Sequence, residues 1–169
     1  PKGVINTQLM LCTNMQQVEQ IRPHEMDEHN VVVDWLPWNH TMGGNHIFNG
    51  IFWSGGSLYI DKGRPIPGMF DETVKNLKEI SPSYYTSVPA GLAMLLEKLK
   101  SDHELQKVFF KNLIAVGYGG ASLPPEVWYG LRDLFKEKTG NNLNLGCGWG
   151  ATETAPVATS TYFELDEPG

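Results

Sequence analysis

Cysteine is scarce in this sequence. Its 169 residues include two, Cys12 and Cys147, which are too far apart to form a CxxC pair. This scarcity argues against a disulfide framework and against a cysteine-rich zinc site. We expect both cysteines to be small core residues of a protein from a reducing, cytoplasmic compartment.

Long apolar runs and a surplus of basic residues are also missing. No run of about 18 apolar residues occurs, so no membrane span is predicted. The 13 Lys and Arg residues are scattered, and the formal net charge is −6. Binding to a nucleic-acid backbone requires a basic stripe, so nucleic acid is not an expected partner. A single nucleotide remains compatible with this charge, because backbone amides and a metal ion can hold it locally.

The hydrophobic pattern alternates between strand-like runs and helical periodicity, without internal repeats. This alternation predicts an α/β fold, with a mostly parallel sheet and helices on both of its faces. The expected strands cover residues 31–36, 57–60, 83–88, 112–116 and 143–145. The expected helices cover residues 8–21, 70–77, 92–99, 101–108 and 127–135. The Ser101-x-x-Glu104 spacing predicts a capping box at the start of the fourth helix.

The strongest local signal is the glycine-rich segment 146–154, which follows the last expected strand. Glycines let a backbone approach a ligand closely. Trp149, Thr152 and Glu153 then offer a face for a base, a donor for a phosphate oxygen and a carboxylate for Mg²⁺. The segment therefore indicates a nucleotide site.

Two other interpretations of this segment remain. Gly146, Gly148 and Ala151 fit a dinucleotide-binding fingerprint, but that fingerprint should open a helix, and Pro156 disfavours one. The segment is also compatible with a glycine-rich turn that has only a structural role.

Two further motifs follow expected strands. Gly119 and Gly120 come after the fourth strand, where open α/β sheets bind ligands, and we expect them to converge with Gly148 and Trp149 at one edge. His40 follows the first strand among aromatic and glycine residues, where a pocket is plausible. His46 is six positions further on, a spacing that does not favour a metal pair on one helical face.

Together these motifs resemble those of adenylate-forming enzymes, the AMP-binding superfamily that includes acyl-CoA synthetases. Segment 1–3 resembles the end of the phosphate loop, and segment 36–40 the aromatic/His motif on the substrate side. Gly119-Gly120-Ala121 resembles the adenine-side turn, and segment 149–153 resembles the Tyr-Gly-x-Thr-Glu motif, with Trp149 in place of Tyr. Segments 34–40 and 67–72 resemble the feruloyl-CoA synthetase branch in particular.

The resemblance implies a carboxylate–CoA ligase that uses ATP, Mg²⁺ and coenzyme A, activates an aromatic or acyl carboxylate as the acyl-adenylate, and releases pyrophosphate. Lys2 would contact the outer phosphates, Thr152 would donate to a phosphate oxygen, and Glu153 would hold Mg²⁺. His40 would lie beside the carboxylate or the thiol entrance. The implied nucleotide-binding residues are Gly119, Gly120, Ala121, Gly148, Trp149, Gly150 and Thr152.

The resemblance also implies that residues 1–169 form one partial domain, the central part of the AMP-binding N-terminal domain. The loop before Lys2, the downstream aspartate that binds ribose and the C-terminal domain with its catalytic lysine are then missing. We therefore expect this chain alone to be inactive. The alternative is a ligand-binding or interaction module that shares the fold but performs no chemistry.

An aromatic acid would need a slot with apolar walls. The sequence offers Trp38, Trp53, Tyr84 and Tyr85 as its walls, and Gly43, Gly44 and Gly50 as the small residues that leave room for a ring.

Overall fold

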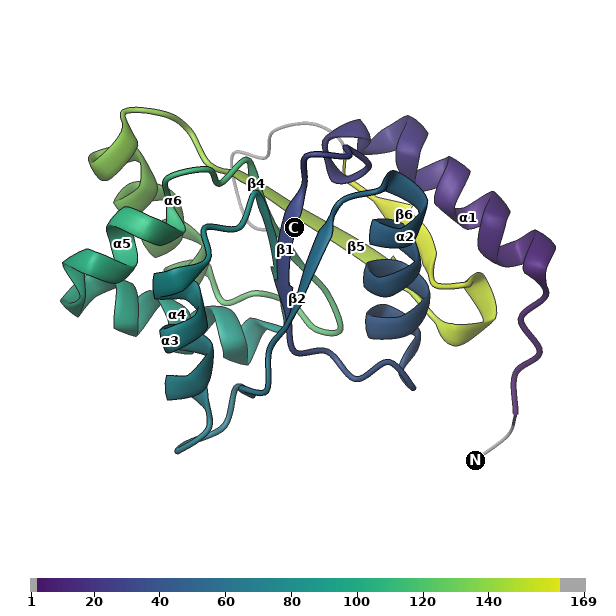
Figure 1. Ribbon diagram of the computed structural model, residues 1–169, viewed down its shortest axis with the longest axis horizontal. Helices are drawn as coiled ribbons and strands as arrows, with labels where there is room; N and C mark the ends of the chain where they lie inside the picture. Colours follow the sequence, from purple (N-terminus) through teal and green to yellow (C-terminus); the bar gives the residue numbers. More distant parts are fainter. Residues whose placement is uncertain (1–2, 162–169) are drawn as a thin grey trace.

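The computed structural model describes residues 3–161 and contains a mostly parallel sheet arrangement (Figure 1). The strands are β1 (Val31–Asp34), β2 (Ser57–Ile60), β3 (Tyr84–Ser87), β4 (Ala115–Tyr118), β5 (Asn144–Gly150) and β6 (Val157–Ser160). β1 pairs with β2, and the order of the others is β3-β4-β5-β6. All these pairs are parallel except the antiparallel pair of β5 and β6.

The two sets of strands are joined at Ser83. Its backbone N–H donates to the Val31 carbonyl at 2.9 Å, and its hydroxyl oxygen accepts from the Val31 N–H at 2.9 Å. This contact places β1 beside β3. The carboxyl ends of the parallel strands therefore lie along a common edge.

Helices flank the strands on both sides, as Figure 1 shows, with α1 and α2 on one side and α3 to α6 on the other. The helices are α1 (Gln8–Ile21), α2 (Asn49–Ser54), α3 (Phe70–Glu79), α4 (Pro89–Ser101), α5 (His103–Phe109) and α6 (Pro125–Thr139). A π-helical segment, η2 (Met42–Phe48), leads into α2, and two short 3₁₀ turns are η1 (Pro23–Glu25) and η3 (Thr152–Thr154). The expected α/β architecture is confirmed.

The helix ends follow local chemistry. Pro89 opens α4 and Pro125 opens α6, where a missing backbone N–H costs nothing. α6 ends at Gly140, which has a left-handed φ of 77°. The capping box expected at Ser101 is wrong. Asp102 caps α5 instead, because its carboxylate accepts from the Leu105 N–H at 3.0 Å.

The main core lies between α3 to α6 and the strands β3 and β4. Its members include the fully buried side chains Leu77, Tyr85, Leu92, Leu95, Leu99, Leu105, Phe109 and Leu131. A second cluster joins β1 to the helices of the other side through Val32, Ile47, Ile51 and Tyr84. Burial of each such side chain stabilises the fold by about 1.5–3 kcal/mol.

The cysteines do not both belong to the core. Cys12 is exposed on α1, so the expectation for this residue is wrong, whereas Cys147 is partly buried and packs against the main core. Cys12 is exposed because the buried face of α1 is formed by Asn14, Met15 and Val18.

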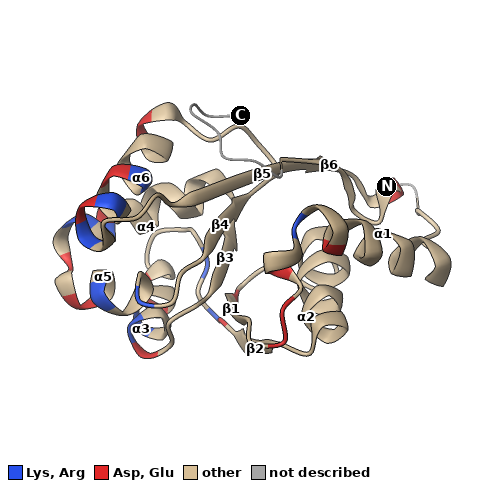
Figure 2. Cartoon of the chain, turned by 90° about the horizontal axis from the view of Figure 1, so that it is seen from above, with Lys and Arg blue, Asp and Glu red and all other residues tan. Residues whose placement is uncertain are grey.

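Charged residues of both signs gather on α3, α5 and α6 (Figure 2). Lys78 illustrates the pattern, since its amine lies 2.7 Å from Asp102 and 3.2 Å from Glu104. Within residues 3–161, no helix is long and apolar enough to cross a membrane.

β6 is attached to α1 through one side chain. The Asn14 amide nitrogen donates to the Val157 carbonyl at 2.8 Å, and its oxygen accepts from the Val157 N–H at 3.2 Å. Asn14 is buried on the inner face of α1. The first helix therefore fixes the position of the strand that follows the glycine-rich segment.

Candidate functional site

The glycine turns after β4 and β5 lie side by side. Tyr118 is the register partner of Cys147, so Gly119 and Gly148 come next on adjacent strands. A β-carbon placed on Gly119 would lie 3.6 Å from the carbonyl oxygen of Gly148. The two turns thus converge at one edge of the sheet, as the sequence predicts.

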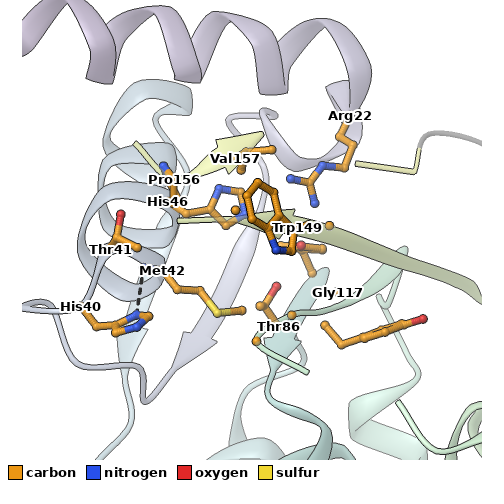
Figure 3. Close-up of a pocket in the computed structure, with 16 residues that line it drawn as sticks. Arg22, His40, Thr41, Met42, His46, Thr86, Gly117, Trp149, Pro156 and Val157 are labelled. Atoms are coloured by element: carbon orange, nitrogen blue, oxygen red, sulfur yellow. Dashed lines mark hydrogen bonds between the residues drawn. The ribbon is translucent and has the colours of Figure 1, made fainter. Parts of the chain in front are cut away.

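Two cavities share these turns. The first encloses about 120 Å³, and Figure 3 shows the side chains around it. The second encloses about 570 Å³. Residues that line both cavities are Tyr118, Gly119, Gly120, Gly148, Trp149 and Gly150. Ala121 lines the second cavity only.

Trp149 is the aromatic residue at the junction of the cavities. It lies on β5 and is 65% exposed, so a large apolar face is available to a ligand. The adjacent Gly150 must lack a side chain, because a β-carbon there would collide with the Pro156 carbonyl. The backbone next to Trp149 therefore packs closely against the segment that leads into β6, which fixes the position of Trp149 on β5.

The dinucleotide interpretation fails on this geometry. β5 continues through Gly150 instead of turning into a helix at the glycines. Only the 3₁₀ turn η3 follows, and β6 then begins at Val157. No helix N-terminus is formed where the pyrophosphate of a dinucleotide would need one.

Thr152 and Glu153 lie in η3, and both are exposed. Neither lines the two cavities, so the structure places them near the glycine turns but outside the hollows. The Thr152 carbonyl accepts from the Asn6 amide at 2.9 Å, and the Asn6 oxygen accepts from the Asn45 amide at 3.1 Å. The segment after Gly3 therefore reaches the Thr-Glu turn, although Lys2 itself lies outside the described residues.

Asn6 was not singled out by its sequence. An asparagine in this segment belongs to no motif, and its partner Thr152 is 146 positions away.

Within residues 3–161, no group of three or more His, Cys, Asp or Glu side chains is placed to hold a metal ion.

His40 lines the first cavity and is exposed. Its Nδ1 accepts a hydrogen bond from the Met42 N–H at 3.2 Å. A neutral His40 therefore carries its proton on Nε2, which leaves that nitrogen as a donor.

A buried polar cluster adjoins the first cavity, and its members Arg22 and Glu25 were not recognised from the sequence. Arg22 Nη1 lies 2.7 Å from Glu25 Oε1, and His46 Nε2 lies 3.7 Å from Glu25 Oε2. Burial, together with the nearby Arg22 cation, lowers the pKa of His46 to about 3. His46 is therefore neutral at physiological pH.

Tyr84 completes this cluster. Burial raises the pKa of its hydroxyl, and the charge of Glu25 adds to the effect. Tyr84 is thus a neutral phenol that lines the first cavity beside Arg22 and His46. No periodicity marks these residues as neighbours, because they come from four separate elements or turns.

The other aromatic residues expected around an acid pocket lie elsewhere. Tyr85 belongs to the main core, and Trp38 packs on Phe48 with ring centroids 4.8 Å apart. Trp53 lines a separate groove with α1 and donates to Glu19 at 3.3 Å. Among the four expected walls, Tyr84 alone lines the first cavity.

The glycines at the start of η2 do not leave room for a ring. A β-carbon on Gly44 would collide with the Trp38 carbonyl, and one on Gly43 would lie 2.6 Å from the Pro37 carbonyl oxygen. Neither glycine lines the first or the second cavity. Their role is close backbone packing, and the expectation that they shape the pocket is wrong.

Residues 1–169 match the family described as AMP-binding enzyme. No curated protein matches the sequence. The fold is similar to that of a long-chain-fatty-acid–CoA ligase from Archaeoglobus fulgidus, with a TM-score of 0.74 and 22% identity over 95% of this chain and 31% of that chain.

A malonyl-CoA ligase solved as a ternary product complex with methylmalonyl-CoA and AMP is also similar, with a TM-score of 0.74 and 22% identity over 95% of this chain and 32% of that one. The adenylation domain of a keto acid-selecting NRPS module, bound to keto acyl adenylate, gives a TM-score of 0.70 at 11% identity over 90% of this chain and 27% of that chain. These likenesses show the fold. The chain spans about a third of the length of the first two structures.

Proposed function

Because the chain belongs to the AMP-binding enzyme family, we propose that it is the central part of the N-terminal domain of an adenylate-forming carboxylate–CoA ligase. The longer enzyme would join a carboxylic acid to AMP and then to coenzyme A. One observation carries the proposal: the glycine turns of β4 and β5 meet beside Trp149, and two cavities share these residues.

The second cavity suits the nucleotide. Gly119, Gly120 and Ala121 offer a flat backbone surface on one side, and the exposed Trp149 ring offers a stacking face on the other. Stacking of a base on an aromatic side chain contributes about 1–3 kcal/mol. We assign adenine to this cavity for that reason.

The phosphates of ATP would then extend toward η3. Thr152 is exposed, so its hydroxyl would be able to donate to a phosphate oxygen, and Lys2 would contact the outer phosphates. Asn6 fixes the relative position of these two segments through its 2.9 Å bond to Thr152. A fixed donor array stabilises the charge that develops at the α-phosphate without reorganising during the reaction.

Mg²⁺ fits the same edge. The Glu153 carboxylate is exposed, and Mg²⁺ is normally held by one or two carboxylates together with substrate phosphates and water. When bound, the ion would neutralise phosphate charge. The chain itself contributes Glu153 as the carboxylate ligand.

The first cavity suits the acid. Met42, Trp149 and Val157 provide apolar surface, and His40 lies on one side of the opening (Figure 3). An acid in this cavity would reach the nucleotide across the shared glycine turns, which provides the proximity that adenylation requires. We propose an aromatic, feruloyl-like acid, because segments 34–40 and 67–72 resemble that branch and the Trp149 ring offers a stacking face.

Pyrophosphate exchange tests the proposal. The longer enzyme should exchange labelled pyrophosphate into ATP only when an acid is present, and hydroxycinnamates should support faster exchange than fatty acids of similar length. Exchange with fatty acids alone would refute the aromatic assignment. Binding of acid and nucleotide without any exchange would instead identify a non-catalytic module.

A further inference from the structure

One cation is buried beside the first cavity. Arg22 lies immediately after α1, its side chain is 7% exposed, and it lines the cavity. Burial of a charged group is costly unless the group is paired, and the 2.7 Å contact of Nη1 with Glu25 provides that pairing. The Nε atom has no hydrogen-bond partner among the described residues. Arg22 is therefore oriented by Glu25 and still has an unused donor.

The side chains around Arg22 leave its Nε–H group available to a ligand. His46 is neutral because burial holds its pKa at about 3, and Tyr84 is a neutral phenol. Glu25 faces Arg22 at 2.7 Å, and His24 lies 4.0 Å from the same carboxylate oxygen. Burial raises the pKa of the Glu25 carboxyl, and the Arg22 cation opposes that rise. With Glu25 ionised in this contact, a second carboxylate would place two anions beside one cation. An uncharged oxygen can accept from Arg22 without that repulsion.

Arg22 and His40 lie on opposite sides of the cavity in Figure 3, with Met42 and Trp149 between them in this view. An elongated acid whose carboxylate lies near His40 would therefore direct its distal end toward Arg22. Met42 and Trp149 are apolar, and Thr86 and Tyr84 contribute neutral hydroxyls to the same cavity. Arg22 is therefore the charged hydrogen-bond donor that the distal end would meet.

We propose that Arg22 determines substrate specificity by donating a hydrogen bond to an uncharged oxygen at the distal end of the acid, such as a phenolic or methoxy oxygen. This inference rests on the proposed function, because it places the acid in the first cavity. It narrows the substrate class to acids with a distal oxygen acceptor. A site built around such a donor rejects an analogue that lacks the acceptor, since the buried donor is then unsatisfied.

The test compares 4-hydroxycinnamate with cinnamate, which differ in the distal oxygen alone. Arg22→Met would leave Glu25 buried without a partner, so it is combined with Glu25→Gln. Glu25→Gln alone and Arg64→Met, at an exposed arginine, are the controls. The longer enzyme is assayed by acid-dependent pyrophosphate exchange and by tryptophan-fluorescence titration with each acid.

We expect the double variant to lose at least about tenfold of the preference for the hydroxylated acid, in both kcat/KM and binding. Arg64→Met should keep the preference, and Glu25→Gln should keep most of it. An equal loss for both acids would assign Arg22 a structural role and overturn the proposal. If the double variant does not fold, Arg22→Lys is tested instead, because it keeps the positive charge beside Glu25. It should reduce the preference for 4-hydroxycinnamate over cinnamate, and an unchanged preference would overturn the proposal.

The two proposals fail separately. Absence of exchange with every acid would refute the ligase, while the fluorescence titration would still measure the preference that Arg22 predicts. Exchange with equal binding of the two acids to the unmodified enzyme would refute the role of Arg22 and leave the ligase intact.

Discussion

Replacement of Asp34 by Asn should stabilise the protein at neutral and alkaline pH. Asp34 ends β1 and is 4% exposed. Its Oδ1 accepts from the Leu36 N–H at 3.2 Å, but its Oδ2 has no partner among the described residues. Burial is the main reason that the pKa of this carboxyl is raised to about 7; the charge of Asp61 acts in the same direction, and hydrogen bonds from the backbone oppose it.

The magnitude follows from that pKa. The difference between the ordinary value of 3.8 and about 7 corresponds to about 4 kcal/mol, at about 1.4 kcal/mol per pKa unit. The folded protein keeps the Asp34 proton to higher pH than the unfolded chain does, so it binds more protons between about pH 4 and pH 7. The free energy of unfolding therefore falls as pH rises through this window, and the loss is complete above about pH 7.

Urea unfolding followed by tryptophan fluorescence checks this expectation. At about pH 8, Asp34→Asn should raise the free energy of unfolding by up to about 4 kcal/mol, whereas at about pH 4 the variant and the original protein should nearly coincide. Asn keeps the oxygen that accepts from Leu36, so the loop contact survives. Asp133→Asn, at an exposed position on α6, is the control and should change neither value. Parallel pH profiles for Asp34→Asn and the original protein would refute the reasoning.

Three predictions concern the nucleotide site of the longer enzyme. Glu153→Gln removes the charge assigned to Mg²⁺ and should lower pyrophosphate exchange by about 10²-fold; near-original exchange over a range of Mg²⁺ concentrations would contradict the role. Trp149→Ala should raise the KM for ATP by about tenfold through loss of stacking, and Trp149→Phe should return the KM most of the way to its original value. An unchanged KM for ATP in Trp149→Ala would refute the stacking assignment. Gly120→Ala should lower the free energy of unfolding, measured with urea, by about 1–2 kcal/mol, because the φ of 86° at Gly120 is left-handed. Gly146→Ala should lower it less, because Gly146 has no positive φ and has room for a β-carbon. Equal decreases would show that backbone conformation is not the cause.

The architecture was predictable because the helices have clear apolar faces and recognisable ends. Phe70, Val74 and Leu77 recur at helical spacing, and all three are buried on α3. The strands were located less accurately. β5 extends to Gly150 through three glycines of low strand propensity, because parallel and antiparallel neighbours on its two sides supply the backbone hydrogen bonds. β6 was missed for a related reason, since the Thr- and Ser-containing segment 157–160 has no apolar alternation.

The site was predictable to the extent that it consists of consecutive residues after strands. The meeting of Gly119 with Gly148 follows from parallel pairing alone. Arg22 and Glu25 could not be found in this way, because their place beside the cavity depends on how α1, η1 and η2 pack together. Gly44 was misjudged for the same reason: a small side chain either makes a space or lets another chain segment fill it, and here the Trp38 carbonyl fills it.

Asn14 has a consequence for the edge of the sheet. Its amide presents a donor and an acceptor to Val157 in the way that one residue of a neighbouring strand would. A helix thus occupies the hydrogen-bonding groups of Val157 on an edge strand, which are then unavailable to another molecule. Asn6 lies just before Thr7, the N-cap of the same helix, and binds Thr152, so the turn between β5 and β6 is contacted near both of its ends. The segment that carries Thr152 and Glu153 is therefore held by the side-chain amides of Asn6 and Asn14. Its position depends on the placement of α1 as well as on its pairing in the sheet.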